Sequence, residues 1–221
     1  MKQKVVIFGT GTTADVTHYY LRHDSPFEVV GFTVDEAHVA APTHLGLPVF
    51  AFERLEASLP PSEVAMLVAI SYVKINLARA RVYERAKAKG YALVNYVSSR
   101  CTTWPDLVIG DNCNIHEGCV IEPFARIGSD VVMASCTTIS HHSTIGDHCF
   151  IASNVVICGN STIEPFCFIG ANATIRDGIR IGKGCIIGAG SLVLEDTREH
   201  AVYGGRPAIL LPRQSQQLDR I

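Results

Sequence analysis

The sequence predicts a mixed fold: a small N-terminal α/β domain with a Rossmann-like parallel sheet, followed by a parallel β-helix. Three observations support this prediction. Strand-like and helix-like segments alternate in the first part of the chain, a glycine-rich turn follows the first apolar segment, and a six-residue repeat fills the second part. Along the chain we expect an α/β domain over residues 1–98, a junction over 99–107, a β-helix over 108–196 and a capping tail over 197–221.

The first part alternates between strands and helices. The expected strands are the apolar stretches 4–8, 27–34, 64–70 and 92–97. The expected helices run from the glycine-rich turn to about residue 23, over 53–58, and over 74–89. Such alternation is typical of a parallel sheet.

The second part repeats an aliphatic residue at every sixth position, 15 times over residues 109–193. These positions are Ile109, Ile115, Ile121, Ile127, Met133, Ile139, Ile145, Ile151, Ile157, Ile163, Ile169, Ile175, Ile181, Ile187 and Val193. A helix buries residues every 3.6 positions and a strand every 2, so neither explains this period. A triangular β-solenoid of hexapeptides does, with three hexapeptides to an 18-residue coil and five coils in all.

Four residues after each aliphatic position stands a smaller residue, expected at a bend where space is short. Five of the eight cysteines fall in this second series: Cys113, Cys119, Cys149, Cys167 and Cys185. Buried free cysteine packs as a small hydrophobe, so these are interpreted as reduced packing residues of a cytoplasmic protein.

Charge and hydropathy argue against nucleic-acid binding and membrane insertion. The net charge of −2 does not favour a nucleic acid. No apolar run approaches the roughly 20 residues of a membrane span, so no membrane insertion is expected. The first apolar run ends at Gly9, too early for a signal peptide.

The turn Gly9-Thr-Gly11-Thr12-Thr13-Ala14 is similar to the dinucleotide fingerprint, and Asp35 ends the second strand, where a ribose-binding acid belongs. Glycines let backbone N–H groups approach a phosphate at a helix N-terminus. A domain with about four strands suits one nucleotide, such as that of a nucleotide-linked sugar, better than a redox dinucleotide. A tight turn without a ligand is the alternative.

His141 and His142 follow an interior isoleucine, at an outer corner of the solenoid. Gly159 lies one coil later and leaves space beside His141, as a reacting amine or thioester requires. Histidine can act as a general base near neutral pH. Two solvated corner histidines are the alternative. A zinc site is not expected, because His116 and His148 do not stack with this pair.

The whole chain resembles the two-domain bacterial sugar acetyltransferases with a left-handed β-helix. Their substrates are nucleotide-linked 4-amino sugars, and their relatives include sialic acid O-acetyltransferases. The resemblance rests on the glycine-rich turn, the hexapeptides and the tail segment 202–208, which is similar to the family pattern V-x-G-x-P-A. It implies a left-handed helix, a homotrimer, and acetyl-CoA as co-substrate in the groove between neighbouring prisms.

The resemblance also assigns site residues. His141 matches the catalytic histidine, and His142 takes the place of its glutamate partner. Phe150 takes the place of a second histidine that contacts the cofactor, and Ala171 and Ala189 match backbone contacts to CoA.

Gly9, Gly11, Thr12, Thr13 and Asp35 are assigned to the nucleotide-sugar site, with Thr12-Thr13 where many members carry Gly-His. The sequence thus favours an acetyl-CoA-dependent N-acetyltransferase that acts on a nucleotide-linked amino sugar for surface glycan biosynthesis. A sugar or sialic acid O-acetyltransferase and a non-catalytic trimeric solenoid binding protein are the alternatives.

Overall fold

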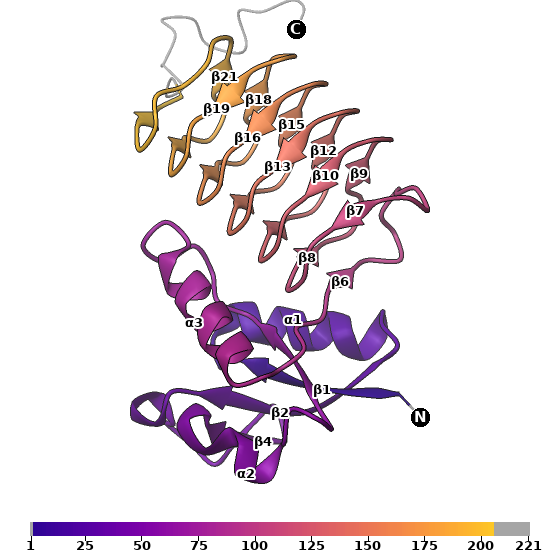
Figure 1. The fold of residues 1–221 in the computed structure, drawn as a ribbon, viewed down its shortest axis with the longest axis vertical. Helices are drawn as coiled ribbons and strands as arrows, with labels where there is room; N and C mark the ends of the chain where they lie inside the picture. Colours follow the sequence, from indigo (N-terminus) through magenta and orange to yellow (C-terminus); the bar gives the residue numbers. More distant parts are fainter. Residues whose placement is uncertain (1, 206–221) are drawn as a thin grey trace, which may run out of the picture.

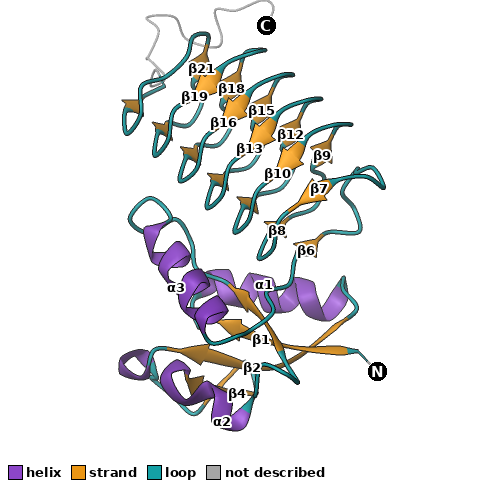
Figure 2. Ribbon diagram, viewed as in Figure 1, coloured by secondary structure: helices purple, strands orange, loops and turns teal. Residues whose placement is uncertain are grey.

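The computed structural model describes residues 2–205, which form an α/β part and a solenoid. Figure 1 shows the solenoid as a rod of stacked coils that rises above the α/β part, with α1 and α3 close to its first coils. Figure 2 shows that helices are confined to the α/β part, whereas the solenoid consists of short strands joined by turns.

The α/β part is built on a five-stranded sheet with the order β3-β4-β2-β1-β5. Its strands are β1 (Gln3–Phe8), β2 (Phe27–Val34), β3 (Thr43–His44), β4 (Leu47–Ala51) and β5 (Ala65–Val68). Its helices are α1 (Thr12–His23), α2 (Leu55–Ser58) and α3 (Leu77–Ala88), with short 3₁₀ turns at Glu36–His38 and Phe52–Arg54. All pairings are parallel except β3 with β4.

The central strand β1 is buried on both sides, as its run Val5-Val6-Ile7-Phe8 predicts. Val5 and Ile7 pack on the side of α1, with Leu21 of that helix, whereas Val6 and Phe8 pack on the side of α3. Helices therefore cover both faces of the sheet. The carboxyl end of β1 leads directly into the glycine-rich turn, between the ends of β2 and β5.

The solenoid has three faces, each a ladder of two-residue strands. Face 1 contains β7 (Val108–Ile109), β10 (Arg126–Ile127), β13 (Thr144–Ile145), β16 (Thr162–Ile163) and β19 (Arg180–Ile181). Face 2 contains β6 (Tyr96–Val97), β8 (Asn114–Ile115), β11 (Val132–Met133), β14 (Phe150–Ile151), β17 (Phe168–Ile169), β20 (Ile186–Ile187) and β22 (Val202–Tyr203). Face 3 contains β9 (Val120–Ile121), β12 (Thr138–Ile139), β15 (Val156–Ile157), β18 (Thr174–Ile175) and β21 (Leu192–Val193).

The sixfold pattern is confirmed as the solenoid interior. Pairs such as Ile127 with Ile145 lie directly opposite each other, 18 residues apart. Every residue of the aliphatic series is buried except the first, Ile109, which is half-buried. The smaller series is buried too, and the eight cysteines are free thiols. The chain folds as the predicted left-handed parallel β-helix behind an α/β domain.

The structure departs from the prediction at several places. The stretch 92–97 does not continue the α/β sheet: Leu93 makes one bridge to Met66, and β6 pairs with β8 of the solenoid instead. A further strand, β22, follows the last repeat and pairs with β20. The predicted tail segment 202–208 is described only as far as Gly205, and its remainder lies outside the described residues.

Helix α3 begins at Leu77 rather than at Lys74, because the three residues before Leu77 adopt a left-handed backbone conformation. Lys74, Ile75 and Asn76 all have positive φ, between 53° and 65°. Asn76 is buried, and its side-chain amide donates to the backbone oxygen of Cys167, 3.1 Å away. This bond to the solenoid holds a backbone conformation that is costly for non-glycine residues.

A buried polar network joins the two parts of the chain. The Arg79 guanidinium, fully buried, donates to Asp130 Oδ1 (3.0 Å) and to the backbone oxygens of Asp130 (2.9 Å) and Cys149 (3.1 Å). His148 and Asn112 occupy the remaining positions around the Asp130 carboxylate, at 2.8 and 2.7 Å. Because every charge here has a partner, the α/β part is held in one position against face 2.

Candidate functional site

The two glycines of the glycine-rich turn differ in the space around them: Gly9 is tightly packed, whereas Gly11 is not. Gly9 has φ of +128°, and a Cβ there would lie 2.9 Å from the backbone oxygen of Ala69, so no other residue fits. A Cβ on Gly11, the N-cap of α1, would meet nothing within 4 Å. The N-terminus of α1 is thus uncrowded at Gly11, and its first N–H groups have no acceptor within the helix.

Asp35 lies at the end of β2, as predicted, but its carboxylate already has a partner. Arg85 of α3 donates to Asp35 Oδ1 at 2.6 Å, and this hydrogen bond raises the pKa of Arg85. This bond engages only one of the two carboxylate oxygens. The arginine, which the sequence did not single out, orients this acid beside the turn.

His141 and His142 lie at the corner between β12 and β13, where face 3 meets face 1, and both side chains are exposed. Their Nδ1 atoms are 3.2 Å apart, a hydrogen bond in which one ring donates and the other accepts. His142 has φ of +59°, and its ring packs against Phe124 with centroids 4.7 Å apart. With Nδ1 of His141 engaged, its Nε2 is left for a substrate.

Gly159 is placed against His141, as the 18-residue register predicts. A Cβ at Gly159 would lie 2.6 Å from Cε1 and 2.9 Å from Nε2 of His141, so any side chain there would collide with this edge of the ring. The backbone N–H of His141 donates to Glu122 Oε2 at 2.8 Å. This carboxylate, missed in the sequence because it comes from the preceding coil, fixes the backbone of the corner.

Phe150 lies on face 2 and does not reach the histidine corner. It stacks on Phe168 with centroids 5.6 Å apart, and Tyr72, from the loop after β5, packs against both rings. Thr12 and Thr13 of α1, together with Tyr72, Asn114, His116 and Phe150, line a crevice of about 240 Å³ between the α/β part and face 2. The structure therefore joins Phe150 to the predicted substrate turn.

Ala171 and Ala189 lie at a third location, the corner between faces 2 and 3. Gly170 and Gly188 precede them, and a Cβ on Gly170 would lie 2.5 Å from the backbone nitrogen of Ala189. Glycine at position 170 thus allows successive coils to pack closely at this corner. In one chain the predicted residues form three groups: the histidine corner with Gly159, the crevice with Phe150, and the alanine corner.

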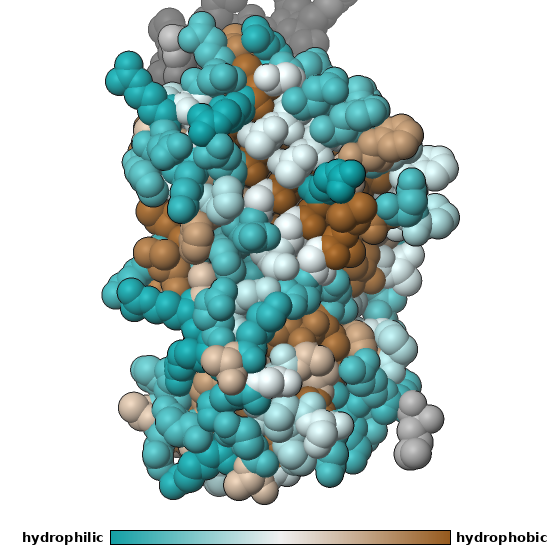
Figure 3. All heavy atoms as spheres, viewed as in Figure 1, coloured by the Kyte–Doolittle hydropathy of each residue, from teal (hydrophilic) through white to brown (hydrophobic). Residues whose placement is uncertain are grey.

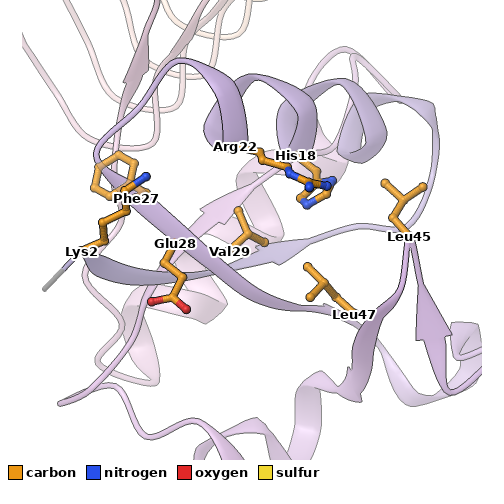
Figure 4. A pocket seen from close by; sticks show the side chains of 8 residues that line it. All are labelled: Lys2, His18, Arg22, Phe27, Glu28, Val29, Leu45 and Leu47. Carbon is orange, nitrogen blue, oxygen red and sulfur yellow. The ribbon is translucent and has the colours of Figure 1, made fainter.

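Another pocket, of about 370 Å³, lies at the far end of α1 (Figure 4), where His18 and Arg22 of the helix face Leu45 and Leu47. It contains no residue of the three groups. Within residues 2–205, no helix is long and apolar enough to cross a membrane, and no three His, Cys, Asp or Glu side chains come together as metal ligands would.

Comparison with known proteins agrees with this architecture. Segments 106–141, 142–176 and 160–195 match the family described as bacterial transferase hexapeptide (six repeats). No curated protein sequence matches the chain.

Solved structures match over nearly the full length. PerB from Caulobacter crescentus, in complex with CoA and GDP-perosamine, is 24% identical with a TM-score of 0.80 over 93% of this chain and 95% of that chain. The acetyltransferase domain of PglB from Neisseria gonorrhoeae is 22% identical with a TM-score of 0.79 over 95% and 100%. WeeI from Acinetobacter baumannii AYE is 20% identical with a TM-score of 0.61 over 95% and 100%.

These matches confirm the resemblance inferred from the sequence at the level of fold. Residues 106–195 match the model of the bacterial transferase hexapeptide, and the chain as a whole shares the two-domain, left-handed β-helix fold of PerB and of the PglB acetyltransferase domain.

Proposed function

We propose that the protein is an acetyl-CoA-dependent N-acetyltransferase that acts on the amino group of a nucleotide-linked amino sugar. The observation that carries the proposal is the contact between Gly159 and His141, which keeps the reactive edge of an exposed imidazole clear at a solenoid corner. The fold supports it, since PerB holds CoA and GDP-perosamine and the PglB domain has been solved with acetyl coenzyme A.

His141 acts as the general base. The sugar amine attacks the thioester carbonyl of acetyl-CoA, and its proton passes to Nε2 of His141. A C–N bond forms, the C–S bond breaks, and the histidine returns the proton to the departing thiolate. Binding both substrates side by side supplies the proximity, so no acyl-enzyme is needed.

His142 orients the base in place of a carboxylate. For Nε2 of His141 to accept a proton, Nδ1 of the same ring must carry the hydrogen and donate a hydrogen bond to Nδ1 of His142, 3.2 Å away. Phe124, packed on the other ring, holds His142 in position. Unlike a carboxylate, His142 supplies no negative charge to stabilise the imidazolium, so it acts mainly by orienting the base.

The complete site requires a second copy of the chain. The histidine corner joins faces 3 and 1, and in a triangular prism this corner lies opposite face 2, where the crevice opens. Apolar side chains remain exposed at this corner and along face 3: Phe124 lies at the corner, and Val156 and Leu192 lie on face 3. In Figure 3, hydrophobic side chains are likewise more prominent on the solenoid than on the α/β part. A homotrimer would bring the histidine corner of one chain to the crevice of the next.

The remaining predicted residues have roles in this arrangement. The turn with Gly9, Gly11, Thr12 and Thr13 binds the diphosphate, and Asp35 binds the ribose. Acetyl-CoA runs along the groove between neighbouring solenoids, where Gly159 and the backbone at Ala171 and Ala189 contact it. Phe150, predicted as a cofactor contact, is assigned to the crevice beside the turn instead. The acetylated product serves surface glycan biosynthesis in the cytoplasm.

A thiol-release assay tests this function. Acetyl-CoA is offered with GDP-, UDP- and dTDP-linked 4-amino sugars, each beside the analogue that has a hydroxyl in place of the amine. We expect CoA release with at least one amine and a product heavier by one acetyl group. Release with hydroxyl analogues alone would favour the O-acetyltransferase, and binding without release would favour the non-catalytic solenoid.

Variants of the two histidines test the assignment of the base. We expect His141→Ala to lower kcat by roughly 10²–10⁴ and His142→Ala by about tenfold. CoA affinity should be unchanged in both variants. A more damaging His142→Ala beside an active His141→Ala would show that the base is His142.

A further inference from the structure

The crevice between α1 and face 2 contains an unusual polar group. Asn114 of β8 lines it and is only 3% exposed, and its side-chain NH₂ donates to Thr17 Oγ1 at 3.0 Å. Its amide oxygen, also buried, accepts no hydrogen bond from any residue in the range 2–205. Buried acceptors of this kind are rare because leaving one unpaired is costly. The oxygen therefore points to a hydrogen-bond donor that arrives with a ligand.

The rest of the lining defines the chemistry of that ligand. No Asp, Glu, Lys or Arg lines the crevice, and Tyr72 and Phe150 supply aromatic surface. Burial lowers the pKa of His116, so its ring is neutral at pH 7. An uncharged crevice with aromatic walls and one free acceptor suits a neutral ring with a hydroxyl rather than a phosphate.

Sheet order indicates which end of a nucleotide-linked sugar enters. β1 leads into the glycine-rich turn, with β2 on one side and β5 on the other. Asp35 ends β2, whereas Ser71 and Tyr72 follow β5 and reach the crevice. A diphosphate held at the turn with its ribose over β2 must place its sugar over β5.

We propose that this crevice is the sugar subsite, and that Asn114 selects the sugar by accepting a hydrogen bond from a ring hydroxyl while Tyr72 covers an apolar side of the ring. The inference rests on the proposed function and adds to it specificity residues from the solenoid of the same chain. The sugar amine stays free to face His141 of a neighbouring copy.

Calorimetric titration tests the proposal. For each of GDP, UDP and dTDP, the affinity for the bare diphosphate is compared with that for the linked amino sugar: GDP-perosamine, or a UDP- or dTDP-linked 4-amino sugar. Asn114→Leu keeps the side-chain volume but lacks the acceptor. We expect it to bind the sugar nucleotide about tenfold more weakly and the bare diphosphate with unchanged Kd. Tyr72→Ala, on an exposed loop, should show the same selective loss. Tyr19→Ala, an exposed tyrosine on α1 outside the crevice, is its matched control.

The outcomes separate the two claims. Equal weakening of sugar nucleotide and diphosphate in both variants, or no weakening in either, would overturn the sugar subsite while the proposed function stands. A wild-type protein that binds none of the sugar nucleotides would overturn both. If Asn114→Leu does not fold, Tyr72→Ala alone decides, because its side chain is half exposed and its removal leaves the core intact.

Discussion

Gly159→Ala offers the most direct test of the histidine corner, because it adds one carbon at a known place. That carbon would lie 2.6 Å from Cε1 and 2.9 Å from Nε2 of His141, whereas ordinary contacts are 3.4–4 Å. The imidazole must therefore move by about 1 Å, a displacement that can cost about 10²-fold in rate when a catalytic group is misplaced.

The fold should tolerate the change. Gly159 does not adopt a positive φ, and the atoms that the new carbon meets belong to an exposed side chain that can rotate away. We expect kcat to fall about 10²-fold in the thiol-release assay, with a change in unfolding free energy below about 1 kcal/mol, or within about 4 °C in Tm.

Two controls make this result specific. Gly204→Ala, at a solenoid glycine where a Cβ meets nothing within 4 Å, should leave kcat unchanged. In a His141→Ala background, Gly159→Ala should have no further effect, because it acts through that ring. Full activity of Gly159→Ala with an unchanged Tm would show that His141 is not the reacting group.

Three further predictions concern stability. Ile157→Ala should lower the unfolding free energy, measured with denaturant, by about 2–5 kcal/mol, because Ile157 is fully buried in the solenoid. Val156→Ala, on the outer face, should cost less than about 1 kcal/mol. Equal small losses in both variants would contradict the interior placement of Ile157. Arg79→Ala should lower the unfolding free energy by about 3–5 kcal/mol, because it leaves the buried Asp130 carboxylate without its cation. Arg81→Ala, at an exposed position of the same helix, is the control and should have little effect. An Arg79→Ala protein as stable as wild type would contradict the network at the domain junction. Hydrogen bonds from Ser99, Tyr96 and Ser98 lower the pKa of Asp24 to about 2. Wild type should therefore be more stable than Asp24→Asn by about 1 kcal/mol at pH 7, and this advantage should disappear as the pH falls from about 4 through about 2. A stability difference that does not depend on pH would contradict this prediction.

The solenoid can be predicted in detail from the sequence because its residues act locally. Each interior isoleucine and each small bend residue occupies a position that is repeated every 18 residues. The same register predicts that Gly159 lies beside His141 and that His142 lies beside Phe124, and both contacts are present in the structure. The α/β order and the turn at Gly9 are also visible in the sequence as strand and helix patterns.

Contacts between distant segments cannot be predicted in this way. The stretch 92–97 has the apolar character of a sheet strand, but only the position of the first coil decides that Tyr96 and Val97 pair with β8. The residues before α3 have a helical pattern, but Asn76 instead bonds to the backbone of Cys167, 91 residues away. The crevice is hidden from sequence reasoning for the same reason, since Tyr72 and Asn114 belong to different parts of the chain.

The central claim is that acetyl transfer occurs at a site built from His141 of one copy and the N-terminal turn of another. Co-expression of His141→Ala and Gly11→Val chains with different tags, followed by isolation of mixed oligomers, tests it most directly. Each variant alone should be nearly inactive, since one lacks the base and the other blocks the start of α1. In each mixed trimer one of the three sites combines an intact His141 with an intact turn, so mixed oligomers should recover about a third of wild-type thiol release per site. Mixed oligomers no more active than the separate variants would contradict a site shared between copies.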